Sequence, residues 1–143
     1  MRILIDTNII MDFIVERPPF SDEAEKLISL CIEKDIPCSI AAHTVPNLFY
    51  ILRKYLNDAE RRDILLRVCK MFTVVDINSD RLISALEKLE FKDFEDCLQV
   101  ECDEHFSADF IVTRNAQDFV SSTIPVIMPN NLVAKLTEQH QQN

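Results

Sequence analysis

The order of apolar patterns along the chain is the feature that most limits its fold. Longer segments with apolar residues at helical spacing separate short runs rich in Val and Ile. Parallel strands need crossover connections, usually helices, so this alternation is typical of a parallel sheet. We therefore predict an α/β protein, a three-layer α/β/α sandwich with a parallel central sheet. The predicted strands are residues 2–5, 37–42, 72–77, 109–113 and 125–128, and the predicted helices are residues 7–15, 21–32, 44–55, 57–70, 79–89, 93–106 and the segment from 129 onward.

The length and the apolar content of the chain predict one domain. A chain of 143 residues with 48% hydrophobic residues can bury a sizeable core. We expect a single domain at residues 1–136, followed by a polar tail at residues 137–143. The apolar run before Asp6 is too short for a signal peptide or a membrane span, so we expect a cytoplasmic protein without membrane association.

The five cysteines favour reduced, mostly buried thiols. Their number is odd, and no two of them form a C-x-x-C pair. A zinc site built from Cys97, Cys102 and His105 is an alternative. However, Cys97 and Cys102 are five positions apart and would share one helical face poorly.

The chain contains no glycine. At the usual frequency of about 7%, a chain of this length would hold about ten. Loops that cradle phosphates need glycine for close backbone approach or for positive φ, so dinucleotide-binding and Walker A loops are excluded. We expect Asn, Asp or Ser at any turn that needs a positive φ.

Acidic side chains outnumber basic ones by 24 to 15, which gives a net charge of −9. A protein that grips nucleic acid by overall charge needs a basic surface, so this mode of binding is disfavoured. The charge does not exclude an acidic site that recruits metal ions. With such a site, affinity for a nucleic acid would depend on the metal and on local cations, for which the candidates are Arg2, Arg53, Lys54 and Arg114.

Polar residues gather where the predicted strands end. Ligands of open parallel sheets sit beyond the carboxyl ends of the strands, and the connecting helices begin at this same edge. Asp6 closes the first strand, and Thr113 closes the fourth. The set predicted at this edge comprises Asp6, Asp96 and Asp118, with Asn8, Asn47, Asp93, Glu95, Thr113 and Asn115 around them.

A cluster of carboxylates of this kind predicts a bound cation. Three or more acids without a lysine among them repel one another strongly. Oxygen ligands select Mg²⁺ or Mn²⁺ over zinc, and a metal held in this way can activate water and stabilise a displacement at phosphorus. We therefore predict a phosphodiesterase in which Asp6, Asp96 and Asp118 hold Mg²⁺ or Mn²⁺.

Each part of this cluster also has a simpler explanation. Asp93 has the spacing of a capping box with Asp96 and can cap the helix that it begins. Asp6 can likewise cap the first helix, and Asp118 can cap a turn. The case for a site therefore depends on the independent placement of these residues at one edge of the sheet. For His43 we expect a structural or exposed position.

Three separated motifs resemble the PIN-domain family. They are LIDTNIIMDF at residues 4–13, DFEDCLQ at 93–99 and ADFIVTRNAQDF at 108–119, with SSTIPVIMP behind the last. The resemblance spans nearly the whole chain and implies a flavodoxin-like fold with a metal-dependent ribonuclease site. The chain is similar to the toxins of bacterial type II toxin–antitoxin pairs, which cleave RNA and are silenced by a small antitoxin protein. Because dimers are common in this family, the resemblance also implies a possible homodimer.

Position by position, the resemblance implies roles for individual residues. The family's first acid falls on Asp6 and its third on Asp96. The fourth falls on Asn115 or, in members with a T-R-N-x-x-D-F pattern, on Asp118. The supporting polar positions match Asn8 and Thr113.

The chain departs from the family pattern at the second acid. The family usually has Glu there, whereas the segment HTVPNLFYILRK places Asn47 at this position. The change removes one negative charge and weakens the case for two tightly held metals. Glu95 could compensate, although it points about 100° away from Asp96 around the helix axis. The departure motivates an alternative, a degenerate PIN module that binds RNA or a protein partner without hydrolysis.

Overall fold

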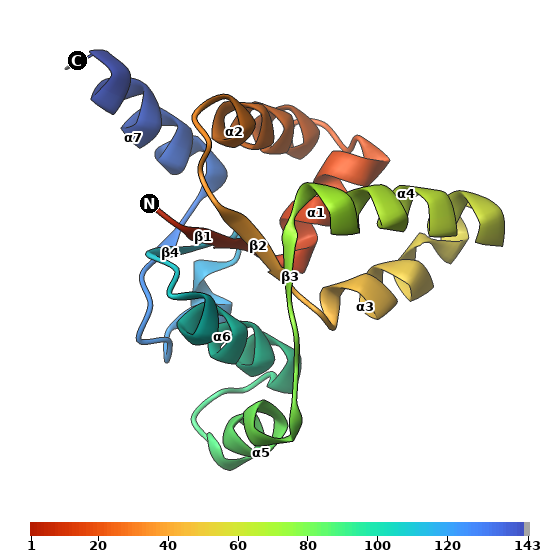
Figure 1. The fold of residues 1–143 in the computed structure, drawn as a ribbon, viewed down its shortest axis with the longest axis vertical. Helices are drawn as coiled ribbons and strands as arrows, with labels where there is room; N and C mark the ends of the chain where they lie inside the picture. Colours follow the sequence, from red (N-terminus) through yellow and green to blue (C-terminus); the bar gives the residue numbers. More distant parts are fainter. Residues whose placement is uncertain (142–143) are drawn as a thin grey trace.

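Five short strands form the central sheet of the computed structural model, which describes residues 1–141 (Figure 1). Their order across the sheet is β3-β2-β1-β4-β5, and every neighbouring pair is parallel. β1 is the central strand, where Ile3 lies beside Cys38 on one side and Phe110 on the other. The strands are β1 Ile3–Ile5, β2 Cys38–Ala41, β3 Thr73–Val75, β4 Phe110–Val112 and β5 Val126–Ile127.

Helices cover both faces of this sheet (Figure 1). Ile3 and Ile5 face a core shared with α1, α2, α3, α4 and α7, while Leu4 faces a second core with α6. α5 packs against α6, through Ala85. The predicted three-layer sandwich is therefore confirmed. The helices are α1 Thr7–Val15, α2 Phe20–Glu33, α3 Thr44–Ile51, α4 Asp58–Met71, α5 Ser79–Glu87, α6 Phe94–Phe106 and α7 Pro129–Gln141, with 3₁₀ helices η1 Leu52–Lys54 and η2 Ala116–Phe119.

Several boundaries differ from those predicted. The strand predicted at 72–77 contains only Thr73–Val75, the three residues that pair with Ser39, Ile40 and Ala41 of β2. The helix predicted at 44–55 is an α-helix only as far as Ile51 and then tightens into η1. Residues 137–141 of the predicted polar tail continue α7, since Glu and Gln are good helix formers. Residues 142–143 lie outside the described residues. In the described part of the chain, no helix is long and apolar enough to cross a membrane.

Because the chain has no glycine, residues with a Cβ atom adopt a positive φ at three turns. Glu16, Asp35 and Ser107 adopt left-handed φ values of 53°, 54° and 57°. Glu16 ends α1 and Ser107 ends α6, where glycine is the usual residue. Asp and Ser were expected at such turns, whereas the glutamate was not. The left-handed region costs a residue with a Cβ atom roughly 1–2 kcal/mol, so the rest of the fold must hold these turns in place.

A buried ion pair fixes the segment after β4 against α1. The Asp12 side chain is fully buried, and it accepts hydrogen bonds from Nε and Nη2 of Arg114 at 2.7 and 3.2 Å. Arg17 donates a further hydrogen bond to Asp12 at 3.1 Å. Arg114 also packs over the Phe20 ring, with 3.9 Å between the guanidinium carbon and the ring centroid. The residue after Thr113 is thus tied to the first helix of the chain.

Replacing Arg114 with Met should destabilise the fold. The variant leaves Asp12 buried with one cationic partner instead of two, and removing one partner of a buried ion pair costs about 3 kcal/mol. Urea unfolding of wild type and variant at pH 7 measures this loss. Arg67→Met is the matched control, because the Arg67–Asp63 pair is 73% and 64% exposed and should contribute less than about 1 kcal/mol. Equal stability of both variants would contradict the structural role of Arg114.

Candidate functional site

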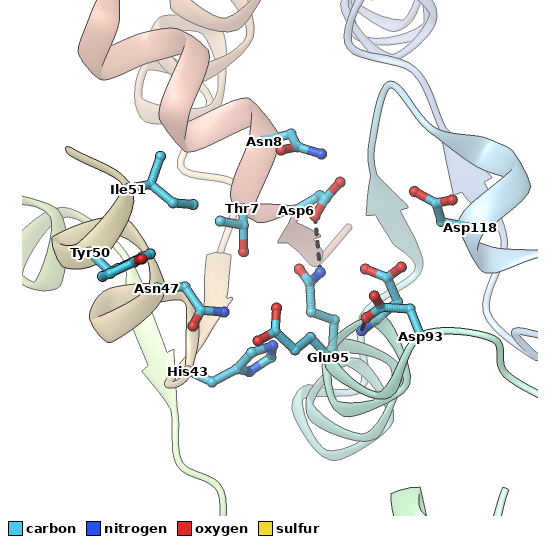
Figure 2. Close-up of a pocket in the computed structure, with 12 residues that line it drawn as sticks. Asp6, Thr7, Asn8, His43, Asn47, Tyr50, Ile51, Asp93, Glu95 and Asp118 are labelled. Carbon is cyan, nitrogen blue, oxygen red and sulfur yellow. Dashed lines mark hydrogen bonds between the residues drawn. The ribbon is translucent and has the colours of Figure 1, made fainter. Parts of the chain in front are cut away.

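A cavity of about 400 Å³ opens at the carboxyl edge of the sheet (Figure 2). It lies where β1 ends and where α1, α3 and α6 begin. Five of its lining side chains are carboxylates, and none of the lining residues, all of them within residues 1–141, is Lys or Arg. The lining residues are Asp6, Thr7, Asn8, His43, Asn47, Tyr50, Ile51, Asp93, Glu95, Asp96, Gln99 and Asp118.

Asp6 is the buried acid of this cavity. Its Oδ1 accepts a hydrogen bond from Gln99 Nε2 at 2.9 Å, and its Oδ2 accepts one from Thr113 Oγ1 at 2.8 Å. Burial raises the pKa of Asp6, while the hydrogen bonds from Gln99 and Thr113 act against this rise. Asp6 occupies the N-cap position of α1, yet its carboxylate reaches partners on α6 and at the end of β4. Helix capping alone therefore does not explain this residue.

The first turn of α6 brings three acids to the cavity. Asp93 caps the helix, because its Oδ1 accepts a hydrogen bond from the backbone N–H of Asp96 at 3.0 Å. The capping role predicted for Asp93 is confirmed, and the residue lines the cavity as well. Burial and then repulsion from Asp93, Asp6, Asp118 and Glu95 raise the pKa of Asp96 to about 7. The acids are thus near enough to one another to disfavour their charged forms.

Glu95 and Asp118 reach the cavity from different directions. Figure 2 shows Glu95 extending toward Asn47 and His43, and Asp118 on the far side of the cavity from Tyr50. Glu95 and Asp96 both line the cavity, although adjacent residues of a helix point about 100° apart around its axis.

The structure also separates the two candidates for the fourth acid. Asp118, on η2, lines the cavity, whereas Asn115 is not among the lining residues. The backbone N–H of Asn115 donates instead to Thr113 Oγ1 at 3.0 Å.

Five lining residues were not among the residues predicted for the site: Thr7, His43, Tyr50, Ile51 and Gln99. Gln99 follows Asp96 by three positions, one turn along the same face of α6, and this spacing is the signal that could have found it. His43 was expected to be structural or exposed, but it lines the cavity, and its two ring nitrogens are buried without hydrogen-bond partners. Burial lowers the pKa of His43, although the nearby Glu95 acts to raise it. The lowered pKa favours the neutral imidazole.

Two of the four predicted RNA-binding cations are wrongly assigned. Arg114 forms an ion pair with the buried Asp12. Arg2 precedes β1, at the opposite edge of the sheet, where its Nε donates to the Phe106 carbonyl at 2.9 Å. Arg53 and Lys54, on η1, follow the helix that supplies Asn47 to the cavity, and both are exposed.

The family model for the PIN domain matches residues 2–117. This match covers most of the chain. The chain belongs to the PIN domain family. Members of this family are generally nuclease hydrolases, and they typically depend on a divalent metal.

Solved structures share the fold of this PIN domain. One is a chain of VapBC2 from Rickettsia felis, in a crystal structure with a DNA fragment from the VapBC2 promoter. It is 18% identical to this chain with a TM-score of 0.69, and the match covers 90% of this chain and 98% of that one. FitAcB from Neisseria gonorrhoeae is 18% identical with a TM-score of 0.66, covering 89% and 97%. A toxin-antitoxin complex from Klebsiella pneumoniae is 25% identical with a TM-score of 0.64, covering 88% and 96%. No curated protein matches this sequence significantly.

The side chains that line the cavity of this PIN domain are of the chemical type that a hard divalent cation prefers. Carboxylate and amide oxygens line the cavity, and these are the ligands of Mg²⁺ and Mn²⁺. Within residues 1–141, however, no group of three or more His, Cys, Asp or Glu side chains is arranged so that it could hold a metal ion. This finding includes the predicted set of Asp6, Asp96 and Asp118, which line one cavity without forming a preassembled metal site. The same finding applies to the zinc alternative of Cys97, Cys102 and His105.

Replacing Asp93 with Asn should lower the pKa of Asp96. Asn keeps the helix cap but removes the negative charge that contributes most, after burial, to raising this pKa to about 7. Because burial remains, we expect a pKa between the ordinary value of 3.8 and 7, so that Asp96 is ionised over a wider pH range. Carbon-13 NMR titration of the aspartate carboxyl groups measures it. Asp22→Asn, an exposed change on α2, should leave this pKa unaltered. No shift in the Asp93 variant would show that the two charges are not coupled.

Proposed function

We propose that this PIN domain is a metal-dependent ribonuclease and the toxin of a type II toxin–antitoxin pair. The observation that carries the proposal is the convergence of five carboxylates on one cavity at the carboxyl edge of the sheet. These acids come from the end of β1, the start of α6 and η2, so no single helix cap accounts for them. The family, whose members are generally nuclease hydrolases, supports the same reaction class.

In this proposal Asp6, Asp96 and Asp118 hold Mg²⁺ or Mn²⁺. When bound, the metal lowers the pKa of a water molecule and neutralises charge on the phosphate. Gln99 and Thr113 keep both Asp6 oxygens oriented toward the cavity. The side-chain amides of Asn8 and Asn47 line the cavity and can donate hydrogen bonds to phosphate oxygens.

Substitution of Asp6 tests both the proposed metal binding and the proposed cleavage of RNA. Purified protein with Mn²⁺ should cleave single-stranded RNA, and Asp6→Asn should slow cleavage by about a hundredfold or more, because a charged metal ligand is lost. Asp109→Asn is the matched control, since Asp109 precedes β4 at the opposite edge of the sheet. Gel analysis of labelled RNA follows the reaction. Equal cleavage by wild type and Asp6→Asn, or no cleavage at any Mn²⁺ concentration, would refute the proposal.

A second candidate function is a PIN module that binds RNA or a protein partner without hydrolysis. One observation favours it: Asn47 lines the cavity at the position where the resemblance to the PIN-domain family implies Glu. Calorimetry separates the two candidates. RNA binding that persists in chelator and is unchanged by Mn²⁺ supports the module, whereas binding that requires the metal supports the nuclease.

The proposed partners follow from the charge of the cavity and from the solved relatives. The Klebsiella pneumoniae chain comes from a toxin-antitoxin complex, which supports a small antitoxin as partner. Five carboxylates without a Lys or Arg among the lining residues suit a cationic side chain from that partner. A homodimer is part of the proposal, as is a cytoplasmic location, which the five free thiols support.

The cationic contact can be tested with the product of the neighbouring reading frame. We expect this small protein to bind the PIN domain and to inhibit RNA cleavage. Changing each of its Arg and Lys residues to Ala in turn should identify at least one whose loss restores cleavage while the complex still forms. If inhibition survives every one of these changes, the proposed insertion of a cation into the cavity is wrong.

A further inference from the structure

An exposed aromatic residue stands at the mouth of the acidic cavity. Tyr50 lines the cavity but keeps 64% of its surface exposed. The guanidinium carbon of Arg53 lies 3.7 Å from the centroid of its ring, and Arg53 Nη1 donates to the Tyr50 carbonyl at 2.8 Å. Arg53 is exposed as well. The two side chains therefore form a pre-ordered, solvent-facing stack of two flat groups, which we term the Tyr50–Arg53 stack.

The position of this stack relates it to the acids. Asn47, Tyr50 and Ile51 all line the cavity from α3, and their spacing of three and four residues places them on one face of that helix. With a rise of about 1.5 Å per residue, Tyr50 lies about 4.5 Å further along the helix axis than Asn47. The stack is thus next to the polar part of the cavity, and Figure 2 shows Tyr50 across the cavity from Asp118.

The charge of the surroundings indicates what the stack can bind. The cavity repels a phosphate chain wherever no cation screens its carboxylates, whereas Arg53 and Lys54 attract one at the end of α3. An aromatic ring backed by a guanidinium group is a surface on which a nucleobase can stack, and every base has a face that fits it. A bulky apolar ligand would not make use of the flanking cations.

We propose that the Tyr50–Arg53 stack binds an unpaired base of a nucleic-acid strand whose neighbouring phosphate enters the acidic cavity. The proposal rests on the proposed function and specifies its substrate class. A base inside a duplex has both faces covered by its neighbours, so the substrate is single-stranded. Stacking tolerates any base, so the stack sets strandedness rather than sequence.

Binding of a labelled ten-nucleotide single-stranded RNA, followed by fluorescence anisotropy, tests this inference. The background is Asp6→Asn with Mg²⁺, so that the RNA is not consumed. Tyr50→Leu should weaken binding by about tenfold, the usual loss when one aromatic stack is removed, whereas Tyr50→Phe keeps the ring and should bind within about twofold of its parent. Tyr55→Leu is the matched control, because Tyr55 is 54% exposed but does not line the cavity.

Two further probes separate stacking from attraction by charge. A ten-unit abasic ribose-phosphate strand carries the same charge without bases, and the Tyr50→Leu change should not alter its binding. A blunt RNA duplex should bind at least about tenfold more weakly than the single strand and should be equally insensitive to Tyr50. Loss of abasic-strand binding in Tyr50→Leu, or tight Tyr50-dependent binding of the duplex, would overturn the inference.

Wild-type cleavage of the same RNA, measured alongside, separates failure of this inference from failure of the proposed function. If the wild type cleaves but Tyr50→Leu binds normally, or if Tyr50→Phe binds as weakly as Tyr50→Leu, the stacking inference falls and the nuclease stands. If binding depends on the Tyr50 ring but nothing cleaves, the stack is supported and the nuclease falls. If the protein neither binds nor cleaves RNA, both fall.

Discussion

The buried carboxylate of Asp6 is the point on which the site and much of the fold depend. It ends the central strand, and its two oxygens accept hydrogen bonds from Gln99 and Thr113, which are 93 and 107 residues away in the chain. These two bonds join β1, α6 and β4. Moving a carboxylate out of water costs free energy unless the carboxylate is hydrogen-bonded. The positions of α6 and of the end of β4 are therefore tied to a side chain that also lines the cavity.

The electrostatics around Asp6 follow from where the chain sends its cations. Arg114, adjacent to Thr113, turns away from the cavity to the buried Asp12, and Arg2 stays at the opposite edge of the sheet. The acids therefore face one another without internal compensation, and burial together with this repulsion raises the pKa of Asp96 to about 7. Such repulsion reduces the stability of the folded state at neutral pH, and a bound cation would relieve it. A cost of this kind in stability is common where a protein holds a functional site.

Much of the fold could be predicted from the sequence because it follows from local periodicity. The alternation of apolar runs and helical segments predicts the parallel sheet, and Asp93 caps α6 as its residue type and spacing indicate. The boundaries that differ depend on non-local pairing. β3 is limited to the three residues that pair with β2, and no property of residues 72–77 themselves reveals this.

By itself, the sequence determined which acids gather at the carboxyl edge, because a strand end or a helix start is a position in the chain. Asp6, Asp93, Glu95, Asp96 and Asp118 all line the cavity as their positions predict. Only the tertiary structure decided which other groups meet them, including Gln99 on Asp6, His43 with its unpartnered ring nitrogens, and the Tyr50–Arg53 stack. Contacts of this kind depend on the rotation of α3 and α6 about their axes, which is set by packing against the sheet and against neighbouring helices.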